Sequence, residues 1–186
     1  GSSQLYSGLC DDSAPIATAA EAAKAAGIVL FASSGNDGET NNMTAPACLS
    51  SVISVGSVYD GNAGPYIGSC NDTPTSADKI SCFSNVSSEL DLLAPGSKID
   101  SSGLGGDIIK FSGTSMASPH AAALAALILQ KNYFSTPDYI KSILLNSGVP
   151  IYDVRVGAYF PRVDSIEALD LTVELDDTVT DNDIDG

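Results

Sequence analysis

The residues Gly113-Thr114-Ser115-Met116-Ala117-Ser118-Pro119-His120 lie between a predicted strand, residues 108–112, and a long apolar helix predicted over residues 115–130. This order places the hydroxyl of Ser115 at the N-terminus of a helix, where free N–H groups and the helix dipole stabilise negative charge. Attack of a hydroxyl on a carbonyl group creates such a charge. Because Gly113 has no side chain, a substrate backbone can approach the serine closely. Ser115 is therefore a candidate nucleophile, although capping a helix is the ordinary role of a serine at this position.

The segments before this one predict an α/β fold. Residues 13–26 begin with Ser13 and Pro15, are rich in alanine and end before Gly27, which is the pattern of a helix. The apolar run Ile28-Val29-Leu30-Phe31-Ala32 follows, and such a run is typical of a strand buried on both faces of a parallel sheet. Further strands are predicted over residues 51–58 and 91–94. A helix followed by a buried strand is the repeating unit of α/β proteins.

The rest of the chain predicts a hairpin and more helices. Residues 98–101 and 108–112 are separated by a glycine-rich segment and predict an antiparallel hairpin. The helix over residues 115–130 is apolar on nearly every side, so we expect it to run through the middle of the molecule. Thr136-Pro137-Asp138 begins a helix that ends at Gly148, and residues 162–169 predict a last short helix.

The composition changes near the end of the chain. Apolar residues become rare beyond Leu171, while Asp and Thr dominate. Such a segment buries too little apolar surface to form packed structure. We therefore predict one domain over residues 1–171 and an acidic linker or tail over residues 172–186.

Length and charge exclude several classes of protein. The chain has 186 residues, of which 44% are hydrophobic, and this is enough for one globular domain with its own core. Only 8 Lys and Arg oppose 23 Asp and Glu, and the resulting net charge of -15 repels nucleic acid and anionic membrane surfaces. No apolar run reaches the length of a membrane-spanning helix. We therefore expect no nucleic acid and no membrane as partner.

The four cysteines favour an extracellular protein with disulfide bonds. They are an even set, and none lies in the C-x-x-C spacing of zinc ribbons or thioredoxin-type motifs. Cys70 and Cys82 flank a polar, turn-rich stretch that a disulfide would close, which would leave Cys10 with Cys48. The sequence does not choose among the pairings that four cysteines allow, and four buried free thiols are the alternative.

The motif around Ser115 resembles the serine-bearing signature of the subtilisin family of serine peptidases. Ser33-Ser34-Gly35-Asn36-Asp37-Gly38 is similar to the segment that carries that family's oxyanion-hole asparagine. Segments 45–46, 52–58 and 83–96 are also similar, in the same order, so the resemblance covers residues 13–170. It implies a three-layer α/β fold with a mostly parallel sheet and a buried central helix, in a secreted protein that hydrolyses peptide bonds of polypeptide substrates through a serine ester.

The resemblance also assigns roles to single residues. Ser115 matches the nucleophile, and Asn36 matches the side-chain donor to the oxyanion. Ser33, Ser34 and Gly35 match one wall of the pocket for the residue before the scissile bond, and their small size implies a roomy, uncharged pocket. By itself, Asn36 in Gly35-Asn36-Asp37-Gly38 has the pattern of an ordinary turn asparagine.

The chain departs from the family by what it does not contain. Neither the aspartate motif nor the His-Gly-x-His motif of the family is present, and the strand that precedes the helix of residues 13–26 in the family is missing or reduced to Gly1-Ser2. Without that strand, we expect an exposed sheet edge and a central helix that lacks partners. The only histidine, His120, is five residues beyond Ser115 and should point away from its hydroxyl on a helix, so we interpret it as structural. The chain is therefore expected to be the C-terminal half of a catalytic domain, inactive without its N-terminal half.

Two other interpretations of the chain and one possible calcium site remain to be considered. The chain could be a non-catalytic pseudoenzyme or interaction fragment of the same fold. It could also come from acidic relatives with a Ser-Glu-Asp triad, but their oxyanion aspartate does not match Asn36. The sequence Asp181-Asn182-Asp183-Ile184-Asp185-Gly186 matches only the first half of a calcium loop. We therefore expect no cofactor and no metal in this chain, and a structural calcium ion only in the full-length protein.

Overall fold

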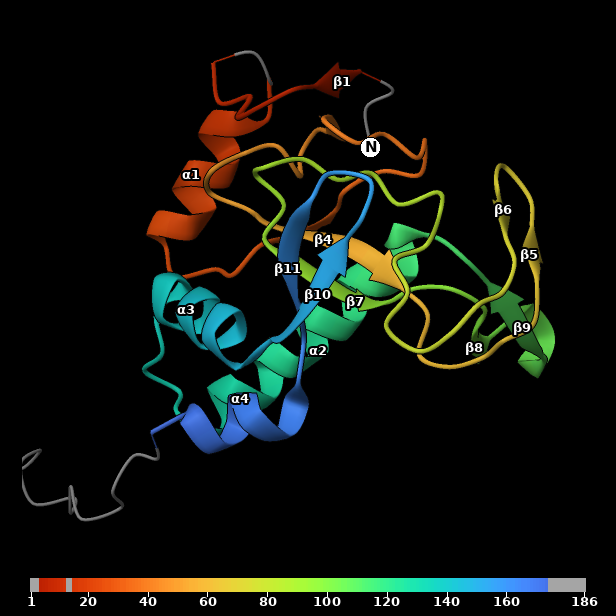
Figure 1. Cartoon of the computed structure of the whole chain (residues 1–186). Helices are drawn as coiled ribbons and strands as arrows, with labels where there is room; N and C mark the ends of the chain where they lie inside the picture. Colours follow the sequence, from red (N-terminus) through yellow and green to blue (C-terminus); the bar gives the residue numbers. More distant parts are fainter. Residues whose placement is uncertain (1–3, 13–14, 174–186) are drawn as a thin grey trace, which may run out of the picture.

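A five-stranded sheet forms the centre of the molecule (Figure 1). The computed structural model describes residues 4–12 and 15–173. The sheet has the order β10-β11-β7-β4-β2, and all neighbours are parallel except β10 and β11. The strands are β2 (Phe31–Ser33), β4 (Ile53–Val58), β7 (Leu92–Pro95), β10 (Val149–Asp153) and β11 (Ala158–Arg162).

Helices cover one face of this sheet. They are α2 (Thr114–Lys131), α3 (Pro137–Ser147) and α4 (Ser165–Leu171). Val55 and Leu92 of the sheet pack in one buried cluster with Ala121 and Leu124 of α2 and with Ile140 of α3. The hydroxyl of Thr136 caps α3 by accepting a hydrogen bond from the Tyr139 amide, as the sequence predicts for the start of this helix.

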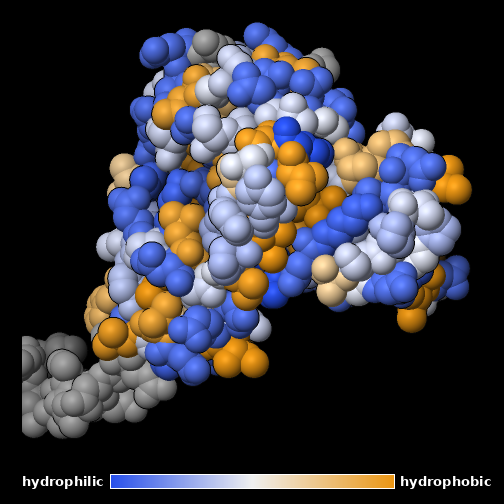
Figure 2. Space-filling view, viewed as in Figure 1, coloured by the Kyte–Doolittle hydropathy of each residue, from blue (hydrophilic) through white to orange (hydrophobic). Residues whose placement is uncertain are grey.

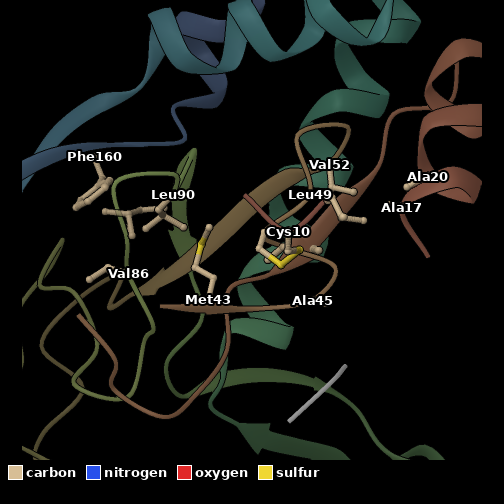
Figure 3. Packing of buried hydrophobic residues seen from close by; sticks show 14 of the residues in the cluster. Cys10, Ala17, Ala20, Met43, Ala45, Leu49, Val52, Val86, Leu90 and Phe160 are labelled. Atoms are coloured by element: carbon tan, nitrogen blue, oxygen red, sulfur yellow. A yellow bond between two sulfur atoms is a disulfide. The ribbon is translucent and has the colours of Figure 1, made fainter. Parts of the chain in front are cut away.

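The opposite face is covered by α1 (Ala17–Ala25) and by loops, which completes a three-layer α/β fold. Ala17 and Ala20 of the helix, Met43 of a short strand and Phe160 of β11 belong to one buried cluster (Figure 3). The short strands β1 (Leu5–Tyr6) and β3 (Met43–Thr44) pair beside it. The disulfide between Cys10 and Cys48 lies inside the cluster and joins the start of the chain to it.

A second disulfide joins Cys70 and Cys82. It closes the polar, turn-rich stretch between them, as the sequence suggested. The stretch belongs to a lobe at the right of Figure 1 that holds β5 (Tyr66–Ile67), β6 (Asn71–Asp72), β8 (Ile99–Ser102), the short helix η1 (Leu104–Gly106) and β9 (Ile108–Phe111). The predicted antiparallel hairpin is confirmed as β8 and β9. Apolar side chains appear on the surface of this lobe in Figure 2, and Ile67, Leu104 and Ile108 are among the exposed ones.

Lys98 ties the two hairpins of the lobe together. Its ammonium group donates to the backbone carbonyl oxygens of Ala63 at 2.6 Å, Pro65 at 2.9 Å and Gly64 at 3.5 Å. Nearby, the buried carboxylate of Asp72 accepts hydrogen bonds from the Tyr59 hydroxyl and the Cys82 amide. Burial raises the pKa of the Tyr59 phenol above its ordinary value, and the charge of Asp72 raises it further.

Two expectations about burial were wrong. The strand predicted over residues 28–32 is not buried on both faces, because Ile28 is 53% exposed and Val29, Leu30 and Phe31 are only half-buried. Its ordered part, β2, is also the edge strand of the described sheet. The helix after Ser115 is not buried on every side. Its apolar outer face, which includes Ala122, Ala126 and Leu127, is exposed, because no described element packs against it.

The end of the domain also differs from the prediction. The hairpin of β10 and β11 was not predicted, and the last helix begins at Ser165 rather than at residue 162, where β11 ends. Asp164 caps this helix by accepting from the amides of Ile166 and Glu167. Most of the predicted acidic tail lies outside the described residues, as does the predicted cap Ser13, so the domain boundaries stay a prediction. No helix among the described residues is both long and apolar enough to span a bilayer.

Candidate active site

Ser115 is the second residue of α2 and its side chain is exposed. Gly113 lies before the helix, and its amide donates to the carbonyl oxygen of Gly96 at 2.8 Å. Gly96 must be a glycine, because an added Cβ would lie 2.6 Å from the Ser57 hydroxyl and 2.9 Å from the Gly113 carbonyl oxygen. The end of β7 and the start of α2 are thus fastened together, which fixes the position of the serine at the edge of the sheet.

Asn36 lies beside the start of the same helix, although it is far away in the sequence. Its side-chain oxygen accepts hydrogen bonds from the backbone amide of Thr114 at 2.8 Å and from the Thr114 hydroxyl at 3.0 Å. Because both bonds engage the oxygen, the amide nitrogen Nδ2 is on the other side of the carboxamide. Nδ2 has no hydrogen-bond partner among residues 4–12 and 15–173 and is available as a donor.

The donors of Asn36 and Ser115 border one space above Gly113. A Cβ added to Gly113 would lie 3.6 Å from Oδ1 and 3.7 Å from Nδ2 of Asn36, and 3.8 Å from the backbone nitrogen of Ser115. Oδ1 is already engaged by Thr114, which leaves Nδ2 as the free polar atom of this carboxamide. An oxygen atom that bears negative charge could be stabilised there by two N–H groups. The structure therefore brings together the two residues that the sequence suggests as nucleophile and oxyanion donor.

Two residues of this arrangement were not identified from the sequence. Thr114 orients Asn36, and its hydroxyl also lies 3.3 Å from the amide nitrogen and 3.3 Å from the carbonyl oxygen of Gly35. Asn85 is fully buried and holds the loop that carries Asn36. Neither was assigned a role from the sequence, although Thr114 lies in the motif around Ser115 and Asn85 lies in the family-like segment 83–96.

Two cavities flank Ser115. One has a volume of about 560 Å³ and is lined by the edge strand β2, including Ser33, and by Ser115 and Pro119. The other has a volume of about 530 Å³ and lies between α2 and the β8–β9 hairpin, where Phe111 and Met116 line it. Both are mainly apolar, so a polypeptide could be held on either side of the hydroxyl.

Only one of the three predicted wall residues lines these cavities. Ser33, which does, ends β2. Ser34 and Gly35 are buried behind this wall, and the Ser34 hydroxyl has no hydrogen-bond partner in the described part of the chain. Gly35 instead connects the loop of Asn36 to Asn85, because its carbonyl oxygen accepts a hydrogen bond from the Asn85 amide at 3.0 Å.

The described residues provide no general base for Ser115. His120 lies on the exposed side of α2, and its Nδ1 makes a 2.7 Å hydrogen bond with the Met116 carbonyl oxygen rather than with the serine. The bond inside the helix fits the expected structural role. Within residues 4–12 and 15–173, no three His, Cys, Asp or Glu side chains are grouped so that they could hold a metal ion.

The match to a family model agrees with this geometry. The model of the subtilase family matches residues 3–177. The chain belongs to the subtilase family. Among curated subtilase relatives, it is 38% identical to subtilisin NAT of Bacillus subtilis subsp. natto over 123 residues, which are 64% of this chain and 28% of that protein. It is 37% identical to serine protease AprX of Bacillus subtilis (strain 168) over 147 residues, which are 71% of this chain and 33% of that protein.

Solved subtilase structures share the fold. The crystal structure of a cold adapted subtilisin-like serine proteinase superposes with a TM-score of 0.64 at 32% identity, and the match covers 80% of this chain and 49% of that one. The expected subtilisin-like α/β architecture is therefore confirmed. The chain spans a third or less of these curated relatives and about half of the solved structure, and the site described above lies within the residues that the family model matches.

Proposed function

We propose that this chain supplies the nucleophile and the oxyanion hole of a serine endopeptidase that acts on polypeptides. The observation that carries the proposal is the convergence of the Asn36 side-chain amide and the Ser115 backbone amide on one space beside an exposed serine hydroxyl. In the proposed reaction, the oxygen of Ser115 attacks the carbonyl carbon of the scissile bond, and the two N–H groups stabilise the resulting oxyanion. Collapse of this intermediate releases the amine product and leaves a serine ester, which water hydrolyses.

The proposal needs an acid–base pair from outside the described residues. A serine hydroxyl is a weak nucleophile until a neighbouring base accepts its proton, and Nδ1 of His120 bonds the Met116 carbonyl oxygen rather than the serine. We propose that the aspartate and histidine come from the N-terminal half of the catalytic domain, and that this chain is inactive alone. The exposed edge of β2 and the exposed face of α2 support this, because the edge offers backbone groups for pairing with a further strand and the face of α2 is apolar.

The proposed environment is extracellular. The four cysteines form two disulfides, Cys10–Cys48 and Cys70–Cys82. Structural disulfides persist in oxidising compartments. The proposed substrates contact the apolar cavity along β2, where Ser33 presents a small, uncharged side chain. No cofactor takes part in the proposed reaction, and a calcium ion is proposed only as a structural component of the full-length protein.

Labelling with a fluorophosphonate probe tests the proposal. We expect the full-length protein to be labelled at Ser115, and a Ser115→Ala variant to lose the label. Ser118→Ala is the matched control, because Ser118 lies on the same helix but lacks the oxyanion donors, so this variant should label normally. Absence of labelling in a folded full-length protein would refute catalysis.

A non-catalytic role of the same fold is the second candidate. The observation in its favour is that no base approaches Ser115 among the described residues. This role predicts a folded full-length protein that neither reacts with the probe nor hydrolyses casein. Orientation of the Asn36 amide by Thr114 argues against it, because a purely structural domain does not need a free donor at this place.

A further inference from the structure

Asn85 is a fully buried asparagine that makes hydrogen bonds through its side-chain oxygen, its side-chain nitrogen and its backbone N–H. It follows Phe83-Ser84, in the loop segment between β6 and β7. Burial of a carboxamide is costly unless its donors and acceptors are satisfied. The partners of these three groups all belong to the loop that carries Asn36, so the residue connects two segments that are far apart in the sequence.

The hydrogen bonds of Asn85 enclose Asn36 from both sides. Its side-chain oxygen accepts from the backbone amides of Asp37 at 2.9 Å and Glu39 at 3.0 Å. Its Nδ2 donates to the Asp37 carboxylate at 3.1 Å, and its backbone amide donates to the Gly35 carbonyl oxygen at 3.0 Å. Residues on each side of Asn36 are thus held by one buried side chain and its backbone.

The loop conformation depends on close contact with this side chain. Gly35 has a φ of +118°, which other residues rarely adopt, and a Cβ on it would overlap Nδ2 of Asn85. Thr114 holds the oxygen end of the Asn36 carboxamide and also contacts the backbone of Gly35, on one side of Asn36. Asn85 bonds residues on both sides of Asn36, and so helps to set the backbone position from which the Asn36 side chain reaches Thr114.

We propose that Asn85 is a positioning residue of the oxyanion hole and acts through Asn36 without touching the substrate. This inference rests on the proposed peptidase function. The oxyanion exists only in the transition state and the tetrahedral intermediate, so a displaced Asn36 donor lowers kcat and leaves ground-state binding unchanged. Loss of Asn85 allows the loop from Gly35 to Glu39 to shift, and a misplacement of about 1 Å is enough to lower a rate about 100-fold.

The test is a double-mutant cycle in the full-length protein with a chromogenic peptide substrate. Asn36→Ala should lower kcat by about 100- to 1000-fold, a magnitude that comes from the same loss in subtilisin itself and not from this structure. Asn85→Ala should lower kcat by roughly 10- to 100-fold with KM changed less than about twofold. In the Asn36→Ala background, Asn85→Ala should lower kcat by less than about twofold, because the donor that it positions is already gone.

Controls separate positioning from loss of structure. Asn42→Ala removes an asparagine of the same loop whose side chain bonds the Glu39 carboxylate, and it should keep kcat within about twofold. If Asn85→Ala does not fold, Asn85→Ser replaces it, because its hydroxyl can still accept one amide bond. Its kcat should lie between those of the wild type and the Asn36→Ala variant.

Different results overturn the two proposals. The positioning role would be overturned if Asn85→Ala lowered kcat equally in the wild-type and the Asn36→Ala backgrounds. It would also be overturned if Asn85→Ala raised KM and left kcat unchanged. Full-length protein that is folded but neither labels at Ser115 nor turns over the peptide would instead overturn the proposed function. Normal labelling with an unchanged kcat in Asn85→Ala would leave the peptidase function intact and remove only the role of Asn85.

Discussion

Replacement of Gly35 by alanine should destabilise the protein far more than the same change at another left-handed glycine. Gly35 has a φ of +118°, and a Cβ there would overlap the carboxamide of Asn85 and lie 3.2 Å from the Thr44 methyl group. Gly27 has a φ of +85° and ends α1, but its Cβ would meet nothing within 4 Å. Both variants therefore carry a backbone penalty, and only Gly35→Ala adds the contact.

The expected magnitudes follow from these contacts. The left-handed conformation costs alanine about 1 to 2 kcal/mol relative to glycine, and this is the whole expected loss for Gly27→Ala. At Gly35, an overpacked methyl group and displaced Asn85 hydrogen bonds are added, so that the loss in the free energy of unfolding reaches about 3 to 6 kcal/mol.

Urea denaturation of the full-length protein in a Ser115→Ala background measures these losses without self-digestion. Combining Gly35→Ala with Asn85→Ala should recover part of the loss, with a coupling energy of about 1 to 3 kcal/mol, because the two side chains no longer compete for space. Equal destabilisation by Gly35→Ala and Gly27→Ala, or strict additivity of the pair, would refute the proposed contact between Gly35 and Asn85.

Three further outcomes are expected from the same denaturation assay. Replacing Cys10 and Cys48 by serine, which opens a crosslink with a sequence separation of 38, should cost about 4 kcal/mol in chain entropy, and no change would contradict its role in the core. Because burial raises the pKa of Tyr59, the wild type should lose stability as pH rises above 10.0, by about 1.4 kcal/mol per unit, and Tyr59→Phe should lack this loss. Thr136→Ala should cost about 1 kcal/mol, because the Tyr139 amide loses its cap; a loss near zero would mean that water replaces it.

Local patterns predicted most of the secondary structure. The glycine that ends α1, the apolar run of β4, the hairpin of β8 and β9 and the Thr136-Pro137 start of α3 depend on neighbours in the sequence, so the residues alone were sufficient. The motif around Ser115 likewise predicted the helix start, and the family was identified from it.

Features that depend on distant partners are not visible in the local sequence pattern. The exposed edge of the sheet and the uncovered face of α2 were expected only from the strand that is missing relative to the family, because an apolar sequence does not report whether a partner covers it. The hairpin of β10 and β11 contains two prolines, Pro150 and Pro161, opposite each other, which local preference disfavours in strands. Asn85 resembles any polar loop residue until its hydrogen bonds to the loop of Asn36 are visible.

Within the lobe that carries the Cys70–Cys82 disulfide, the segment leading into the β5–β6 hairpin is attached to the β8–β9 hairpin by an ammonium group that belongs to the chain itself. Lys98 places a positive charge among the carbonyl oxygens of Ala63, Gly64 and Pro65, a position that a dissolved hard cation would otherwise suit. A covalently tethered charge cannot be removed by dilution or by a chelator. This attachment therefore does not depend on a bound ion, whatever the rest of the full-length protein requires.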